Sequence, residues 1–451
     1  MMRVKKLGLI LFVLILSISL VACSSNGGNN SSGETSQKEG SPQKEESSKK
    51  SESGDKTERV LKLAHYIDPA NKDDVYGVAM TEIIQQFEAE TGIKVDLETL
   101  PWDQMESKLV ISNAAGETVD LSWVSSQKLA SLVNAGALRP IDDFVATYDK
   151  KIMDDFSELE DKATVSELDG KKYLYLASMH TRMLWYNKEL VNTPPQTWAE
   201  LVEIGKQATD KSKGQYGFGF WGSKHYGSIE VAISPFIWSA GGTISNKDGE
   251  VTFNSPETVE ALQFVGDLVH KHGISPESVF TSDSAEIDNA FKAGNIAMVI
   301  NGSYMYDRFM ETEFAKAGNI GVAPIPGKNG PAPNFINGWG MAIPKNAKNP
   351  ELAWEFMKFF NQTEIQIKHS LAEGGIPTRK SAWTDKAFED KPLHQFFFKN
   401  AEENGRPMDP LVYYQEGLEA LNIAALGYFL DAKANVKQLL DDQAKMFNDK
   451  Y

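Results

Sequence analysis

Six large aromatic side chains fall at or near the ends of predicted strands, or in the loops beyond them. A ring in such a place offers a flat apolar face. The C–H face of a pyranose packs on such a ring, and its hydroxyl groups need polar partners. The pattern favours a sugar-binding site, and core packing is the alternative for each ring. The rings are those of Trp102, Trp123, Trp221, Trp238, Tyr304 and Trp339.

Motifs for covalent catalysis are absent from the sequence. It contains no G-x-S-x-G, no H-E-x-x-H and no P-loop lysine. His270 and His272 could indicate a metal site, but side chains two residues apart on a helix do not share a face. A catalytic pair of carboxylates stays open, because acidic residues are numerous and nothing singles out one pair. We therefore expect a binding protein with no metal and no cofactor.

The stretch 290–309, AFKAGNIAMVINGSYMYDRF, indicates how one ring is positioned. It predicts a helix end, a turn at Gly294, a buried strand from Ile296 to Ile300 and a second turn at Gly302. In open α/β sheets, ligands bind beyond the carboxyl ends of the strands. Gly302 would let the backbone approach a ligand closely, and Tyr304 would supply the aromatic face.

Other predicted elements repeat this arrangement of strand, loop and helix. The first strand ends near Tyr66, which would face a cleft together with Asp68. The helix that follows has apolar residues at helical spacing and Gly92 as its C-cap. That first strand is predicted at 60–64, further strands at 93–97, 120–126 and 216–220, and further helices at 129–137, 256–272, 353–360, 418–430 and 436–446.

Composition limits the class of protein. The 451 residues are 41% hydrophobic, which suffices for two or three domains with cores of their own. The formal net charge of −16 would repel phosphates, so we expect no nucleic acid partner. Cys23 is the single cysteine, so no disulfide can form within the chain.

The first 58 residues have the composition of a targeting segment followed by a tether. A positively charged start precedes the apolar run Leu7–Leu20, which is too short for a membrane span. The residues LVAC that end at Cys23 resemble a bacterial lipobox, which implies cleavage before this cysteine and its acylation. The residues after it are polar and bury too little surface to fold. We predict a lipoprotein signal peptide at 1–22, and an acylated cysteine with a disordered tether at 23–58.

Several motifs occur in the order of one known family. The stretch 290–309 resembles the F-x-x-G-x-x-A-M, strand, G-x-W/Y signature of the family 1 extracellular solute-binding proteins, the sugar receptors of bacterial ABC importers. In 195–201, which resembles the P-x-T-W-x-E-L helix start of that family, Thr197 and Glu200 would form a capping box, and Trp198 would be structural. Other matching stretches are 87–109, 120–126, 138–141, 173–188, 236–242, 338–344 and 374–379.

The resemblance implies a periplasmic-binding-protein type II fold. Two α/β lobes would be joined by a hinge, with the ligand cleft between them. Crossovers are expected near Ala177, where the usual proline of the family is missing, near Gly338 and around Ala382. The N-terminal lobe would comprise 59–176 and 338–382, and the C-terminal lobe 177–337 and 383–451.

The same resemblance implies which residues line that cleft. The rings would pack on the ligand, and polar side chains would bind its hydroxyl groups. Arg182 and Arg379 could instead form structural ion pairs. The predicted site is Tyr66, Asp68, Trp102, Trp123, Ser125, Ser126, Arg182, Trp221, Trp238, Gly302, Tyr304, Gly338, Trp339 and Arg379.

The resemblance further implies a carbohydrate ligand, an oligosaccharide given the number of rings, and importer membrane subunits that recognise the closed form. It predicts a monomer anchored by lipid at Cys23 on the extracellular face of the cell membrane, as in Gram-positive bacteria. Two alternatives stay open. One is the same fold binding a polyol-phosphate, an amino-acid derivative or a polyamine. The other is a surface glycoside hydrolase.

Overall fold

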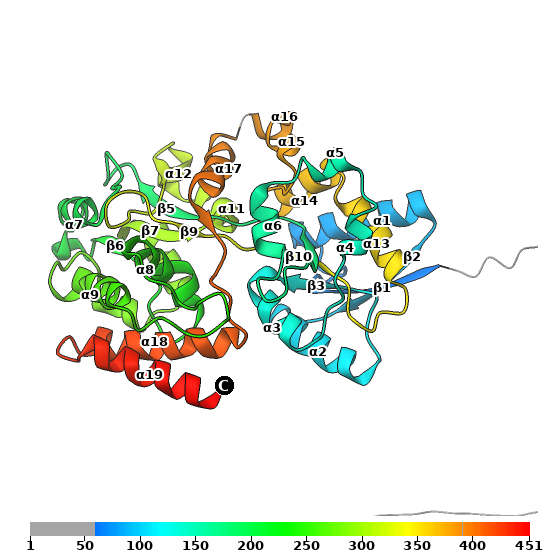
Figure 1. Ribbon diagram of the computed structural model, residues 1–451. Coiled ribbons are helices and arrows are strands. Elements are labelled where there is room, and N and C mark those ends of the chain that lie inside the picture. The colour runs from blue at the N-terminus through cyan, green and yellow to red at the C-terminus, as the bar shows by residue number, and fades with distance from the viewer. Residues whose placement is uncertain (1–58, 390) are drawn as a thin grey trace, which may run out of the picture. The chain divides into compact units, whose positions relative to one another are not determined.

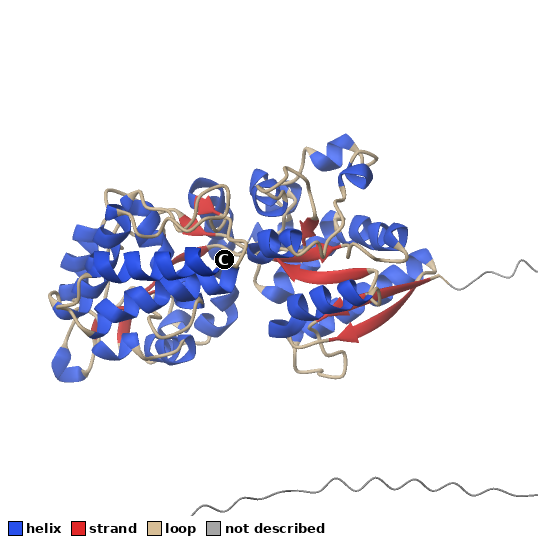
Figure 2. Ribbon diagram, turned by 60° about the horizontal axis from the view of Figure 1, so that its bottom comes forward, coloured by secondary structure: helices blue, strands red, loops and turns tan. Residues whose placement is uncertain are grey.

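The computed structural model describes residues 59–389 and 391–451. The predicted signal peptide, Cys23 and the whole predicted tether lie outside the described residues. In the described part, helices lie outside the strands of two β-sheets (Figure 1, Figure 2). No helix in these residues is both long and apolar enough to cross a membrane.

The first sheet has five strands in the order β2-β1-β3-β10-β4. β1 pairs in parallel with β2 and β3, whereas β10 is antiparallel to β3 and β4. Because β10 comes late in the chain, the chain returns to this sheet after it has built the second one. The strands are β1 (Val60–His65), β2 (Lys94–Thr99), β3 (Leu121–Ser125), β4 (Leu174–Leu176) and β10 (Trp339–Ala342).

The second sheet has four strands in the order β6-β7-β5-β8. β5 is antiparallel to β7 and β8, and β6 is parallel to β7. A short parallel pair, β9 and β11, lies apart from both sheets. These strands are β5 (Arg182–Asn187), β6 (Tyr216–Gly219), β7 (Ile296–Gly302), β8 (Ile320–Ala323), β9 (Asn334–Phe335) and β11 (Gly405–Arg406).

We call the parts built around the two sheets the first and the second lobe. The chain leaves the first sheet at Leu176 and enters the second at Arg182, and it returns between β9 and β10. The two crossing segments touch at Gly338, where an added Cβ would lie 2.0 Å from the carbonyl oxygen of Ser178. Only glycine permits so close an approach of two backbones. The lobe boundaries themselves stay a prediction.

The helices vary from single turns to long amphipathic segments. In chain order they are α1 (Val75–Thr91), α2 (Met105–Ala115), α3 (Leu129–Asn134), α4 (Asp142–Val145), α5 (Lys150–Met153), α6 (Glu158–Thr164), α7 (Trp198–Gln207), α8 (Ser234–Ala240), α9 (Pro256–His270), α10 (Ser284–Lys292), α11 (Tyr306–Met310), α12 (Glu313–Lys316), α13 (Pro350–Phe360), α14 (Thr363–Glu373), α15 (Lys380–Trp383), α16 (Lys386–Glu389), α17 (Pro392–Asn404), α18 (Tyr414–Leu430) and α19 (Val436–Lys450). Single turns of 3₁₀ helix are η1 (Trp102–Gln104), η2 (Ser126–Lys128), η3 (Lys211–Lys213), η5 (Glu277–Phe280) and η6 (Ser303–Met305), and η4 (Ile229–Ile233) is a π-helix.

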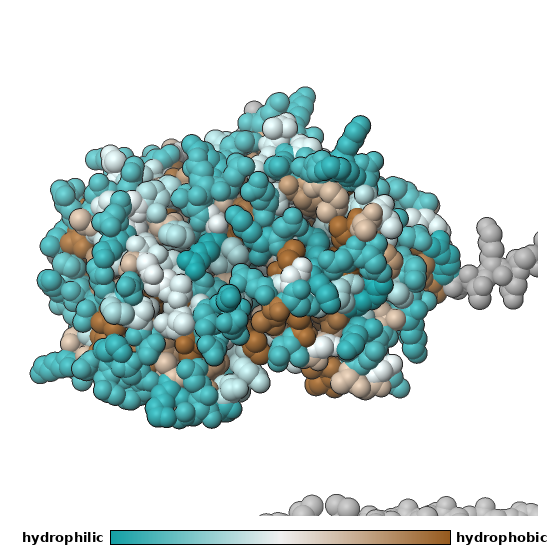
Figure 3. Space-filling view, viewed as in Figure 1, coloured by the Kyte–Doolittle hydropathy of each residue, from teal (hydrophilic) through white to brown (hydrophobic). Residues whose placement is uncertain are grey.

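Apolar residues of the first sheet divide between two cores because successive strand side chains point to opposite faces. Trp123 and Tyr175 belong to one buried cluster, whereas Val124, Leu174 and Leu176 belong to the other, which also fills the second lobe. The face seen in Figure 3 is hydrophilic over most of its area, with apolar residues gathered near its middle. Burial of the cores supplies the main driving force for folding.

Two local predictions are confirmed. Gly92 ends α1 in the left-handed conformation, with φ of 70°. Thr197 and Glu200 form the capping box at the start of α7, and Trp198 is buried there, stacked on Phe264 with ring centroids 4.2 Å apart. These features depend on neighbouring residues, so local sequence suffices to predict them.

The predicted turn at Gly302 is wrong. β7 continues through this residue, which has an extended backbone and pairs with Arg182 of β5. The glycine serves a close approach instead, since an added Cβ would lie 2.1 Å from Cε1 of Tyr304. The helix predicted at 129–137 is also shorter, because α3 ends at Asn134, just before the left-handed Gly136.

Candidate functional site

One cavity of about 430 Å³ is lined by residues of both lobes, and we call it the cleft. The side chains from the first lobe follow the carboxyl ends of β1, β2 and β3 or lie on β10 and α14. Those from the second lobe follow β6 and β7, begin β5 or lie on η4. The lining residues are Tyr66, Trp102, Gln127, His180, Arg182, Trp221, His225, Tyr226, Gly227, Glu230, Val231, Tyr304, Asn337, Trp339 and Glu373.

Tyr304 presents one ring face to the cleft. The ring lies against Gly302, which has no side chain to displace it. The guanidinium carbon of Arg182 lies 5.3 Å from the ring centroid, and the ring of His180 meets it edge-on at 5.6 Å. Tyr304 is nevertheless 37% exposed. Its neighbours therefore fix the ring and leave part of it open to a ligand.

Arg182 is a buried cation, and none of the described carboxylates lies within ion-pair distance of it. Its Nη1 donates to Oδ1 of Asn337 at 2.7 Å, and Asn337 in turn donates to Oε1 of Gln127 at 2.7 Å. Its Nε has no hydrogen-bond partner among the described residues. Burial of a charge without a partner is costly. Arg182 therefore lines the cleft as a buried cation held by Asn337 and the neighbouring rings.

Glu230 reaches the cleft from the π-helix η4, a rare geometry that often occurs at functional sites. The Tyr414 hydroxyl donates to its Oε1 at 2.5 Å. Burial raises the pKa of Glu230, although Tyr414 and the charge of Arg182 act in the opposite direction. A carboxylate only accepts hydrogen bonds, whereas a protonated carboxyl can also donate one to a hydroxyl group.

Glu373 closes the hinge side of the cleft. It accepts a hydrogen bond from Ser178 and lies 3.4 Å from Nε2 of His180 and 3.8 Å from Nδ1 of His369. Burial acts to raise the pKa of Glu373, but the two imidazoles and the Ser178 hydroxyl outweigh it and hold the pKa at about 2. Because its partners lie on the crossing segment and on α14, Glu373 ties these two segments together.

Six residues of the predicted site line the cleft together: Tyr66, Trp102, Arg182, Trp221, Tyr304 and Trp339. Two of them also contact each other, since the rings of Tyr66 and Trp339 meet edge-on at 5.0 Å. The predicted Gly302 and Gly338 lie behind the lining, where they permit the close approaches described above. Contact of these residues with a ligand stays a prediction.

Three predicted residues are buried away from the cleft. Trp123 packs in the first lobe, 4.4 Å from the ring of His65. Trp238 packs in the second lobe and donates through Nε1 to Oδ2 of Asp409 at 3.3 Å. Arg379 forms the structural ion pair that the sequence left open, with its Nε 2.6 Å from Asp155.

The remaining three are polar residues, and the side chains of two of them accept hydrogen bonds from backbone N–H groups. Asp68 is exposed and accepts from the N–H of Ala70 at 2.9 Å, as in an Asx turn. The Ser126 hydroxyl accepts from the N–H of Gly338 at 3.2 Å. Ser125 is buried, and its N–H donates to Glu106 at 3.1 Å. None of these side chains lines the cleft.

Sequence reasoning missed several lining residues, and some of them carried a signal. Glu230 is a single acidic residue inside the apolar run IEVAI, which indicates a buried carboxyl. Asn337 directly precedes the crossover glycine, and Glu373 directly precedes Gly374. The other missed residues are Gln127, His180, His225, Tyr226, Gly227 and Val231.

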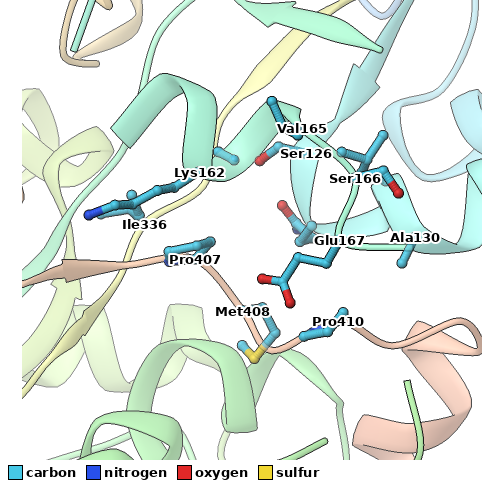
Figure 4. Close-up of a pocket in the computed structure, with 13 residues that line it drawn as sticks. Ser126, Ala130, Lys162, Val165, Ser166, Glu167, Ile336, Pro407, Met408 and Pro410 are labelled. Carbon is cyan, nitrogen blue, oxygen red and sulfur yellow. The ribbon is translucent and has the colours of Figure 1, made fainter. Parts of the chain in front are cut away.

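A second space, which we call the groove, also lies between segments of both lobes (Figure 4). Its larger part measures about 880 Å³. It is bordered by 161–170 from the first lobe and by 243–247 and 406–410 from the second. Figure 4 shows Lys162 and Glu167 on one side and Pro407, Met408 and Pro410 on the other. None of the described residues that line it is aromatic.

Metal chemistry finds no support in this part of the chain. No group of three or more His, Cys, Asp or Glu side chains in residues 59–389 and 391–451 is arranged to hold a metal ion. His270, which belonged to the one suggestive pair, places its Nε2 2.9 Å from the carbonyl oxygen of Phe429. Its ring is thus engaged with backbone.

The chain belongs to the bacterial extracellular solute-binding protein family, whose model matches residues 72–367. A binding protein of Brucella abortus (strain 2308) is 29% identical over 317 residues, which are 67% of this chain and 73% of that protein. An arabinooligosaccharide-binding protein of Halalkalibacterium halodurans is 24% identical over 332 residues, 69% of this chain and 70% of that protein.

Solved structures confirm the predicted type II fold. A cyclo/maltodextrin-binding protein complexed with maltotetraose matches with a TM-score of 0.73 at 24% identity, covering 88% of this chain and 98% of that one. At this identity the match shows the fold and leaves the ligand of this chain to other arguments. The family named by the sequence resemblance is likewise confirmed.

Proposed function

We propose that this chain is a lipid-anchored receptor that captures a carbohydrate in the cleft and delivers it to the membrane subunits of an ABC importer. The observation that carries the proposal is that rings from both lobes border one cavity. Tyr66, Trp102 and Trp339 come from the first lobe, and Trp221, Tyr226 and Tyr304 come from the second. Relatives named for arabinooligosaccharides and a fold neighbour solved with maltotetraose support it.

The polar groups of the cleft suit a neutral ligand with many hydroxyl groups. Arg182 is the one permanent cation among the described lining residues, whereas a phosphate group would favour a cluster of them. A polyamine would need free carboxylates, but Glu373 is engaged by Ser178 and faces two imidazoles, and Glu230 is engaged by Tyr414. The non-sugar alternatives therefore have weaker support.

Closure of the lobes would complete the binding site. Trp102 is 58% exposed and Tyr304 37% exposed, so much of their apolar surface is still available for burial. Hinge closure around a ligand would bury these faces by changing a few dihedral angles in the crossing segments. The closed form would be the one that the importer recognises.

Calorimetry against a broad glycan panel tests the proposal. We expect heat and saturable binding for at least one sugar, and at least tenfold weaker binding by a Trp339→Ala variant that melts at the wild-type temperature. The panel should include a polyol-phosphate, an amino acid and spermidine. Binding of one of these with no response to any sugar would overturn the carbohydrate assignment.

The glycoside hydrolase alternative has a direct test. Glu230 and Glu373 are both carboxyl groups of the cleft, which is the minimum that hydrolysis of a glycosidic bond requires. We expect no shorter products after incubation of the purified protein with the oligosaccharide that it binds. If shorter products form with the wild-type protein and not with a Glu230→Gln variant, the protein is a hydrolase and the receptor proposal is wrong.

Anchoring at Cys23 can be tested in cells. We expect the protein in the membrane fraction with an acylated first residue by mass spectrometry, and a Cys23→Ser variant in the medium. Membrane retention of the variant would contradict the lipid anchor, while the sugar assignment would stand.

A further inference from the structure

His180 lies at the point where the first crossing segment can bend. The backbone of Met179 exchanges two hydrogen bonds, of 2.8 and 2.7 Å, with Ile376 in the loop after α14, and α14 packs beside α1 in the first lobe. The carbonyl oxygen of Thr181 accepts from the N–H of Ser303, which follows β7 in the second lobe, at 3.0 Å. A change in the angle between the lobes must therefore alter the backbone or the surroundings of the residue between these two ties.

The ring of His180 also faces both lobes. Its Nε2 lies 3.4 Å from Oε1 of Glu373, the last residue of α14, and its Nδ1 lies 3.4 Å from Oγ of Ser303. A neutral imidazole carries one N–H and can donate to one of these oxygen atoms, whereas an imidazolium can donate to both. The ring is buried, so the surrounding dielectric is low and both contacts are stronger than they would be in water.

The charges around this ring act in both directions. The carboxylate of Glu373 attracts a positive charge on the ring, and so does the C-terminal end of α14, where the helix dipole is negative. Arg182 acts against it, since Nη1 of this cation donates to the backbone carbonyl oxygen of His180 at 3.4 Å. Gly375 leaves the space for the carboxylate, because an added Cβ would lie 2.8 Å from Oγ of Ser178 and 3.0 Å from Oε2 of Glu373.

Two further imidazoles lie on the first-lobe side of Glu373, and both stay neutral. Nδ1 of His65 accepts from the N–H of Ile67 at 3.1 Å, so the ring proton is on Nε2, which lies 3.3 Å from the hydroxyl of Tyr76. The same hydroxyl lies 3.3 Å from Nε2 of His369. Burial lowers the pKa of both rings, against the charge of Glu373. The other titratable groups nearby are Tyr66 and Asp74 in the first lobe and Glu230, Asp288 and Tyr304 in the second.

We propose that His180 is a proton-sensitive link between the two lobes at the hinge. As an imidazolium it donates to Glu373 on one side and to Ser303 on the other, and its ion pair with Glu373 favours the arrangement of the lobes in this structure. As a neutral ring it loses the ion pair, and other arrangements become more populated. The inference concerns the hinge and holds whatever ligand the cleft binds.

The direction of the pH dependence follows from linkage. A conformation that binds an additional proton is favoured when protons are abundant, so the link holds the lobes at acidic pH and its effect is lost as pH rises. Imidazole is the side chain that changes its charge near neutral pH. Glu373 keeps its negative charge over this range, because its pKa lies at about 2.

The distance between the lobes in the protein without ligand tests the inference. Fluorophores on Ala114→Cys of α2 and Glu416→Cys of α18, both at exposed positions, report this distance by single-molecule energy transfer in a Cys23→Ser chain. We expect the population whose distance matches this structure to gain about threefold over the others from pH 8 to pH 5.5, as for one ion pair. An unchanged distribution would overturn the inference.

Two variants separate the proton from the shape of the hinge. Glutamine keeps hydrogen-bonding groups at either position without titrating, so His180→Gln and Glu373→Gln should each lose the pH dependence, and one folded variant suffices for the test. Asp288→Asn is the matched control, because burial raises the pKa of Asp288 to about 6 and this carboxyl titrates in the same range. The control should keep the full change. A pH dependence that persists in His180→Gln, or that disappears in Asp288→Asn, would overturn the inference.

Discussion

The cleft and the groove both lie between the lobes, but they differ in what lines them. The groove is the larger, at about 880 Å³ against about 430 Å³. The cleft is lined by six Trp and Tyr rings, the buried Arg182 and the buried Glu230, whereas no described residue that lines the groove is aromatic. Volume alone would select the groove. Lining chemistry identifies the cleft as the candidate site.

The difference has a structural origin. Residues of the cleft follow the carboxyl ends of β1, β2, β3, β6 and β7, where side chains are free of sheet pairing. Residues of the groove come from α6 and the loop after it, from the loop after α8, and from the segment that begins with β11, where Arg406 pairs with Asp409.

The largest expected effect on sugar affinity is at Trp339, and it distinguishes binding in the cleft from binding in the groove. We expect Trp339→Ala to weaken sugar binding about 100-fold, roughly 2.7 kcal/mol, because a ring that anchors a ligand is lost. Met408→Ala in the groove should change affinity less than twofold. Titration calorimetry of both variants measures this, and a stronger effect of Met408→Ala would place the ligand in the groove.

A small pocket beside the cleft, lined by Trp221, Asn301 and Tyr304, contains a carboxyl that should make stability depend on pH. Burial raises the pKa of Asp288 from 3.8 to about 6, although Asn301 donates to it. The folded state therefore binds more protons than the unfolded state between these values, and stability falls as pH rises from about 4 to about 6.

Asp288→Asn lacks this titration. The stability of wild type relative to Asp288→Asn should therefore fall by on the order of 2 kcal/mol between pH 4 and pH 7. Urea unfolding of both proteins across this range is the measurement. A difference that is constant with pH would show that Asp288 titrates as in the unfolded chain.

Gly302→Ala should act through Tyr304. The new methyl group would meet the Tyr304 ring at 2.1 Å, and a side chain can move away at little cost to stability. We expect about tenfold weaker sugar binding, roughly 1.4 kcal/mol, with a nearly unchanged melting temperature. In a Tyr304→Ala background the same substitution should have no further effect, and an additive loss would contradict this mechanism.

The smallest expected effect on binding is at Trp238. Trp238→Phe removes the hydrogen bond to Asp409 inside the second lobe, which should lower stability by about 1 kcal/mol. Affinity should stay within twofold of wild type. Weaker sugar binding by a variant of unchanged stability would show that Trp238 contacts the ligand.

Local sequence predicted much of the fold and six of the fifteen residues that line the cleft. Strands, caps and the capping box at Thr197 follow from patterns within a few residues, and the ordered motifs indicated the family. Prediction failed where two segments distant in sequence meet. Trp238, for example, was predicted to line the cleft, but it is buried in the second lobe and bonds to Asp409, 171 positions further along the chain.

The sequence by itself determined the elements, the family and the kind of side chain offered at each strand end. The tertiary structure alone decided which of these side chains share a cavity. Trp123, Trp238 and Trp339 look alike in sequence, yet the first two pack inside a lobe and the third lines the cleft. Burial depends on which distant segments cover a residue, and that is fixed only when both sheets and their crossings are assembled.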